Sequence, residues 1–203
     1  MKKIIEESLE NSYTYNEFSA LVRDLLDENK ATGHTQSEAL TNYSLLNDKR
    51  MKRLNKTIQI NATTIAEMKK INEPQTWLVL TEGWCGDAAQ NLPVIHKIAA
   101  ANKQINLQLV LRDDQEDLMN LFLTNGAQAI PKLLILDKQN NVLQTWGPRP
   151  TIATKMVADY KAKHGALDPE FKKDLQIWYN KNKGQNVQDD FVALIKNLKR
   201  KDA

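Results

Sequence analysis

Hydrophobic and polar positions divide the chain into a helical beginning, a middle of alternating strands and helices, and a helical end. Short apolar runs typical of buried strands lie at 76–81, 105–111, 131–136 and 142–146. Apolar residues at helical spacing follow three of these runs, at about 87–102, through 118–122 and at about 151–164. Strand–helix–strand units need parallel pairing, whereas the polar turn between the last two runs is typical of an antiparallel hairpin. The pattern therefore predicts an α/β fold with a mixed central sheet of about four strands and helices on both faces.

Capping residues predict where several helices begin and end. Three Thr-x-x-Glu patterns, which start at Thr14, Thr35 and Thr64, are typical of capping boxes and predict three helix starts. Asn125-Gly126 is expected to close the second helix of the middle region. Asp168-Pro169 predicts a further helix, with the aspartate as cap and the proline in the first turn.

The composition is that of a globular chain of ordinary domain size. Of 203 residues, 41% are hydrophobic and 26% are charged, and 28 Lys and Arg against 25 Asp and Glu give a net charge of +3. That charge does not by itself indicate a nucleic-acid partner, and none is expected. No stretch approaches the roughly 20 apolar residues of a membrane span, and the first residues lack an apolar core of signal-peptide length. We expect a cytoplasmic protein without a membrane segment, which its single cysteine also fits.

That cysteine, Cys85, follows the first strand of the middle region. The strand breaks at Gly83, Trp84 precedes the cysteine, and a helix is expected from Asp87 onward. A thiol at a helix N-terminus faces unpaired amides and the positive end of the helix dipole, so we expect its pKa to be lowered. Asp87 opposes this effect because a nearby carboxylate disfavours a second negative charge, unless its role is to cap the helix. The alternative is an inert, buried cysteine that behaves as a small hydrophobic residue.

Three features make the chain resemble the thioredoxin superfamily over roughly residues 75–163. Thioredoxin-like proteins carry Trp-Cys-Gly-x-Cys after a core strand, and here Trp84, Cys85 and Gly86 match while Ala88 replaces the second cysteine. They also have a proline eight residues past the first cysteine, where this chain has Pro93. A cis-proline opens a later strand in this superfamily, and Ile130-Pro131 fits that position.

The resemblance implies a substrate groove around Cys85. Pro131 should be cis and lie beside the thiol, and the backbone of Ile130 should hydrogen-bond an extended substrate, as in strand addition. Trp84, Gly86, Asp87 and Ala88 should complete the substrate-binding surface. Alternatively, Pro131 only starts an edge strand and Trp84 only covers the core.

Two basic residues near this groove are candidates for binding the carboxylate of a small thiol. Arg149 lies in the Trp146–Pro150 segment, and Lys132 directly follows Pro131. No cofactor is expected. No metal is expected either, because His34, His96 and His164 are dispersed and one cysteine makes a zinc site improbable.

The departures from the superfamily pattern define the expected chemistry. Ala88 removes the resolving thiol, and Val79 stands where thioredoxins bury an acid that assists that thiol. The resemblance therefore implies monothiol exchange, in which a mixed disulfide at Cys85 is released by an external thiol. The partner would be a client protein or a low-molecular-weight thiol. An engineered cysteine-to-alanine change at position 88 would leave the same sequence and would trap substrates.

Two other functions stay open from the sequence. One is a binding module that keeps the groove and has lost turnover, and the other is a redox sensor whose Cys85 is oxidised. For domain organisation we expect a helical extension over residues 1–74, a thioredoxin-like domain over 75–165 and a second helical extension over 166–203.

Overall fold

A computed structural model of the chain describes residues 1–201 and contains one four-stranded sheet. Its strands are β1 (Gln75–Thr81), β2 (Ile105–Leu111), β3 (Lys132–Leu136) and β4 (Val142–Trp146). They lie in the order β2-β1-β3-β4, with β1 parallel to β2 and the other pairs antiparallel. The expected mixed sheet is confirmed. Because β3 lies between β1 and β4, the alternative that Pro131 merely starts an edge strand is wrong.

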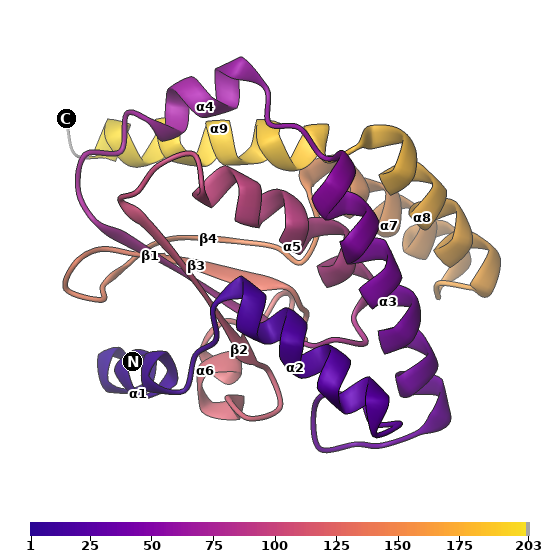
Figure 1. The fold of residues 1–203 in the computed structure, drawn as a ribbon. Helices are drawn as coiled ribbons and strands as arrows, with labels where there is room; N and C mark the ends of the chain where they lie inside the picture. Colours follow the sequence, from indigo (N-terminus) through magenta and orange to yellow (C-terminus); the bar gives the residue numbers. More distant parts are fainter. Residues whose placement is uncertain (202–203) are drawn as a thin grey trace.

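Helices cover both faces of this sheet (Figure 1). Their bounds are α1 (Lys2–Glu10), α2 (Tyr15–Asp27), α3 (Glu38–Thr57), α4 (Ala62–Met68), α5 (Gly86–Ala99), α6 (Glu116–Leu121), α7 (Thr151–His164), α8 (Pro169–Asn182) and α9 (Gln185–Lys201). The thioredoxin-like fold with additional terminal helices is therefore present.

The period of two along β1 sends its side chains into two separate cores. Trp77 and Val79 pack in the larger core, which takes residues from α2, α3, α4, α5 and α9. Leu78 and Leu80 point to the other face and pack with residues of α1 and α6. Phe191 of α9 contacts the Trp77 ring at 5.0 Å between ring centroids. The terminal helices thus pack into the cores on both faces of the sheet.

A third, smaller core joins α7 to α8, beyond the sheet. Phe171, Leu175 and Tyr179 of α8 pack against Ala153 and Val157 of α7. The start of α8 follows the expected pattern, since the Asp168 side chain accepts a hydrogen bond from the Phe171 amide. This pair of helices carries Tyr179 to the beginning of α5, as described below.

Three of the expected helix ends are wrong, and at the two helix starts among them a neighbouring polar side chain caps the helix instead. The Thr14 box is confirmed, but α3 is capped by Ser37 and α4 by Asn61, so the starts predicted at Thr35 and Thr64 fail. Ser and Asn side chains cap as well as Thr does, and the Thr-x-x-Glu spacing cannot rank them. Asn125-Gly126 forms a tight turn after the helix rather than its end, since α6 stops at Leu121.

Candidate functional site

Cys85 is the N-cap residue of α5, where the chain leaves the end of β1. Its Sγ accepts a hydrogen bond from the Ala88 amide at 3.4 Å and donates one to the Ile130 carbonyl at 3.3 Å. The sequence predicted the helix start and the neighbourhood of Ile130 and Pro131. The thiol is therefore held between the first turn of α5 and the loop that enters β3.

The Ile130–Pro131 peptide bond is cis, and so is the Gly147–Pro148 bond beside it. Gly147 has a φ of +109°, and a Cβ placed there would lie 2.1 Å from the Pro131 carbonyl oxygen. Only glycine fits such a close approach at a positive φ. The turn after β4 therefore packs directly on the Pro131 backbone. Arg149 belongs to this turn, so its backbone is positioned by the same contact.

Arg149 reaches Asp87 in the first turn of α5 rather than a free position in the groove. Its Nη2 lies 2.6 Å from Asp87 Oδ2, and the Asp87 side chain is 11% exposed. The hydroxyl of Tyr179, from α8, donates a hydrogen bond to Asp87 Oδ1 at 2.9 Å. Burial raises the pKa of Asp87, and the Arg149 guanidinium and the Tyr179 hydroxyl offset part of that rise. Helix α5, the turn after β4 and helix α8, which are far apart in the sequence, thus meet at the Asp87 carboxylate.

The electrostatics of the thiol are the reverse of our expectation. Burial raises the pKa of Cys85 from 9.0 to about 12, the Asp87 carboxylate adds to the rise, and the Ala88 and Asp87 amides and the Arg149 charge lower it only in part. Cys85 is half-buried and packs against both cores, so its charged form loses part of its hydration. The predicted lowering of its pKa is wrong because this desolvation outweighs the helix N-terminus.

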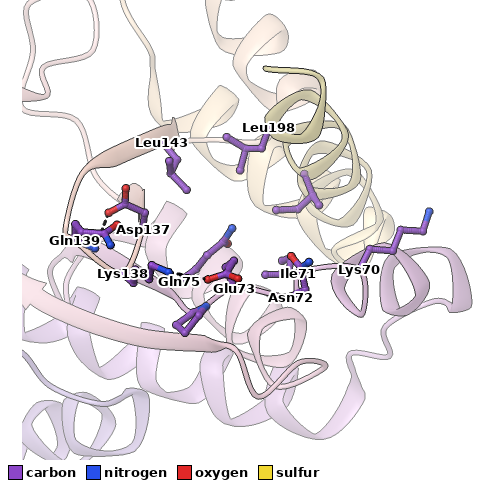
Figure 2. Close-up of a pocket in the computed structure, with 12 residues that line it drawn as sticks. Lys70, Ile71, Asn72, Glu73, Gln75, Asp137, Lys138, Gln139, Leu143 and Leu198 are labelled. Carbon is purple, nitrogen blue, oxygen red and sulfur yellow. Dashed lines mark hydrogen bonds and ion pairs between the residues drawn. The ribbon is translucent and has the colours of Figure 1, made fainter. Parts of the chain in front are cut away.

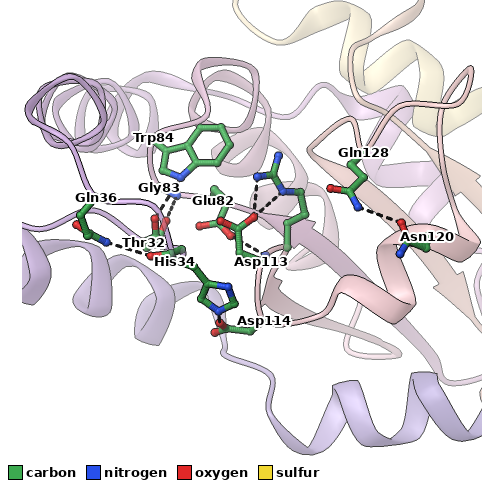
Figure 3. Close-up of polar contacts among 12 residues, drawn as sticks. Thr32, His34, Gln36, Glu82, Gly83, Trp84, Asp113, Asp114, Asn120 and Gln128 are labelled. Atoms are coloured by element: carbon green, nitrogen blue, oxygen red, sulfur yellow. Dashed lines mark hydrogen bonds and ion pairs between the residues drawn. The ribbon is translucent and has the colours of Figure 1, made fainter.

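Trp84 is tied to the loop before α3 and does more than cover the core (Figure 3). Its indole Nε1 donates to the Thr32 carbonyl at 3.2 Å, and the Thr32 hydroxyl accepts from the Gly83 amide at 2.8 Å. The Arg112 guanidinium lies 4.9 Å from the centre of the Trp84 ring, within the range of a cation–π contact. The Nε1 edge and one face of the indole thus contact residues that lie far from it in the sequence.

Glu82 is a second buried acid close to the thiol in sequence. It is 1% exposed, and its Oε1 accepts a hydrogen bond from the Asp113 amide at 3.1 Å. Burial raises the pKa of Glu82, although the Thr32 hydroxyl and the Asp113 amide lower it in part. Its side chain points toward Asp113 and Thr32 (Figure 3). It therefore braces the loops beside Trp84.

The expected site residues lie together, but their exposure differs. Trp84, Gly86 and Asp87 are half-buried, as is Cys85, whereas Ala88, Ile130 and Pro131 are buried. Lys132, the other candidate for binding a carboxylate, is also buried, and its Nζ donates to the Thr124 hydroxyl at 3.2 Å. Burial lowers the pKa of Lys132.

Some neighbours of the site had no signal in the sequence. Tyr179 lies 92 positions from Asp87, and no motif connects the two residues. Arg50 of α3 approaches the first turn of α5, with its Nη1 3.7 Å from where a Gly86 Cβ would lie. Only the packing of α3 and α8 around α5 brings these residues to the site.

A pocket lies at the opposite end of β1 from Cys85 (Figure 2). It lies between the segment that enters β1 and the turn between β3 and β4, and Gln75, Glu73 and Lys138 are among the residues that line it. Lys138 Nζ and Glu73 Oε2 pair across it at 3.2 Å. Since no group of the thiol site lines this pocket, we do not assign the exchange chemistry to it.

The sequence matches the thioredoxin family over residues 33–161, which is more than half of the chain. The chain therefore belongs to the thioredoxin family. The match begins inside the segment that we assigned to the N-terminal extension, so the boundary at residue 74 stays a prediction.

Two solved structures are similar to this chain at 17% identity. A protein of unknown function, PA1234 from Pseudomonas aeruginosa, has a TM-score of 0.57, with 91% of this chain and 98% of that chain covered. An HIV epitope-scaffold has a TM-score of 0.55, with 91% and 99% covered. At this identity both support the fold alone. No curated protein matches the sequence.

Membership of the thioredoxin family supports a redox function of the thiol–disulfide type in general terms, with proteins or thiols as substrates. Among the described residues, no helix is both long and apolar enough to cross a membrane.

Proposed function

We propose that the protein carries out thiol–disulfide exchange through a single nucleophilic cysteine, Cys85. The observation that carries the proposal is the position of its Sγ, which caps α5 and touches the carbonyl of Ile130 in the loop that enters β3. An inert core cysteine would not need to combine these two features. Residues 75–165 would form the exchange domain, with helical extensions over 1–74 and 166–203, of which residues 202–203 lie outside the described part. The compartment would be the cytoplasm.

The proposed reaction has two steps. The Cys85 thiolate attacks one sulfur of a partner disulfide, a bond from Cys85 Sγ to that sulfur forms, and the other partner sulfur leaves as a thiolate that takes up a proton. A low-molecular-weight thiol, as its thiolate, then attacks the partner sulfur of the mixed disulfide and releases Cys85. Ala88 offers no second thiol, so the external thiol is required.

The partner would approach over the half-buried part of the site. Trp84 and Gly86 keep exposed surface beside the thiol, while Ile130 and Pro131 form the buried wall. In the free protein the Ile130 carbonyl accepts the hydrogen bond of the Cys85 thiol at 3.3 Å. Forming the thiolate frees this carbonyl for a backbone amide of an extended substrate, which is the contact expected for a thioredoxin-like groove. Ionisation and substrate binding would then favour each other.

A second candidate function is a binding module that keeps the groove without turnover. The raised pKa of Cys85, caused by burial and by Asp87, favours this candidate because the thiolate is scarce at neutral pH. The same observation argues against a redox sensor, since sensor cysteines are low-pKa thiols.

Incubation with oxidised glutathione at pH 9 tests the proposal. We expect intact-protein mass spectrometry to show one glutathionyl adduct at Cys85, and reduced glutathione to remove it. Cys85→Ser is the control and should show no adduct. If the native protein stays unmodified while the urea-unfolded chain forms the adduct, exchange is refuted and the binding module takes its place.

A further inference from the structure

The buried carboxylate of Asp87 has contacts that the exchange reaction itself does not need. Asp87 lies in the first turn of α5, two residues after the thiol, and one carboxylate oxygen pairs with Arg149 at 2.6 Å. The other oxygen accepts the Tyr179 hydroxyl at 2.9 Å. A substrate-binding carboxylate would be exposed and free, so these contacts indicate a role within the protein.

We propose that Asp87 is a positioning residue that holds Cys85 in its thiol form and thereby sets its reactivity, and that Arg149 and Tyr179 hold the carboxylate in place. The part of this inference that concerns exchange rates rests on the proposed function. The part that concerns the thiol itself does not.

The position of Asp87 explains why water only weakly screens its charge from the Cys85 thiol. Its side chain is 11% exposed, so water screens its charge weakly. Cys85 Sγ accepts from the Ala88 amide in the same helical turn, which keeps the sulfur and the carboxylate on neighbouring residues of one rigid element. A like charge two residues along the same helical turn disfavours ionisation of the sulfur.

Charged groups on the other elements around the thiol do not reverse this effect. Arg149, from the turn after β4, lowers the pKa of Cys85 by less than Asp87 raises it. Arg50 of α3 reaches the Gly86 position and bonds Asn47. Glu82, which precedes the thiol by one turn, bonds the Asp113 amide. The loop of Ile130 and Pro131 carries no charge.

Helix α8 also contributes to the environment of Asp87 and Cys85. Tyr179 holds Asp87, and Gln176 of α8 accepts a hydrogen bond from Gln90 of α5 at 2.9 Å. The hydroxyl of Tyr179 also accepts from Asn91 at 3.4 Å. The helix after the thioredoxin-like core therefore fixes the environment of the thiol.

The test is the pH dependence of alkylation of Cys85 by iodoacetamide in Asp87→Asn. Removal of the like charge should lower the alkylation midpoint and raise the rate at pH 8 on the order of tenfold. Asp159→Asn is the matched control, because it removes an exposed carboxylate that pairs with Lys155 in α7. The control should keep the midpoint of the wild-type protein.

Asp87→Asn leaves the Arg149 charge without its partner and can destabilise the fold. Asp87→Asn/Arg149→Gln removes both charges, and its midpoint should lie between those of the wild type and Asp87→Asn. A natively folded variant, single or double, whose midpoint equals that of the wild-type protein would overturn the inference. If the midpoints shift as expected but no protein forms a glutathione adduct, exchange fails and the role of Asp87 stands.

Discussion

Cys85 should be far less ionised in the native protein than in the unfolded chain. Burial, reinforced by Asp87, raises the pKa of its thiol from 9.0 to about 12. Because each pH unit changes the thiolate fraction about tenfold below the pKa, at pH 8 the native protein should contain about 10³-fold less thiolate than the unfolded chain. Raising the pH should therefore increase reactivity throughout the range from 8 to 11, with no plateau.

Iodoacetamide alkylation, followed by mass spectrometry at fixed times, measures this directly. The comparison is the same protein in urea, where Cys85 should show the midpoint of an ordinary cysteine. As a second reference, the Asp87→Asn variant should react faster than the wild type at each pH below its midpoint. A native midpoint at or below about 8.5, the value of a free cysteine, would refute the reasoning.

The same magnitudes decide whether exchange is possible at all. A less acidic thiol gives a stronger nucleophile, and a Brønsted slope of about 0.4 to 0.5 restores about 15- to 30-fold of the lost reactivity. The net deficit against an ordinary cysteine at neutral pH is then about 30- to 60-fold. That is slow exchange rather than none, and it is the reason to test adduct formation at pH 9.

Two further predictions follow from the contacts of α5. Tyr179→Phe removes a buried hydroxyl bonded to Asp87 and Asn91 and should lower the free energy of unfolding by about 1.5–3 kcal/mol in urea denaturation, whereas Tyr43→Phe, at a 54% exposed position, should change it little. No loss in Tyr179→Phe would mean that α8 does not depend on this contact. Ala88→Cys places a thiol one helical turn from Cys85, where the Ala88 amide already reaches the sulfur, and should form an intramolecular disulfide on mild oxidation that mass spectrometry detects. Two free thiols after oxidation would show that the site cannot adopt disulfide geometry.

The sequence predicted the two central strands well because β1 and β3 are almost wholly buried and read as short apolar runs. β2 and β4 are partly exposed and include polar residues, and they still have the bounds that the sequence indicated. Helix ends were predicted less well, because several residues in each linker can cap. At the start of α3, Ser37 stands two positions after Thr35 and takes the cap.

The location of the thiol could be predicted, and its electrostatics could not. The Trp84-Cys85-Gly86 motif and Ile130-Pro131 placed the sulfur at a helix start against a loop, as the structure has it. The pKa depends on how tightly the surroundings exclude water, and on a carboxylate that Tyr179 holds from a separate helix. A sequence motif indicates which groups lie near the thiol, but it does not indicate how deeply they are buried.

The acid near the thiol differs in position and effect between the superfamily pattern and this chain. In the superfamily pattern the buried acid, at the position of Val79, assists a second thiol, and this chain lacks both groups. The acid nearest the thiol in sequence is Asp87 instead, in the first turn of α5 and bonded to Arg149 and Tyr179. A carboxylate that is largely shielded from water is costly unless it is paired, and Arg149 and Tyr179 pair both oxygens of Asp87. An acid that assists deprotonation must reach the proton it removes, whereas both oxygens of Asp87 are already occupied and its charge opposes ionisation. The site is therefore built to restrain its single cysteine, and a partner that displaces Arg149 or Tyr179 would change its reactivity.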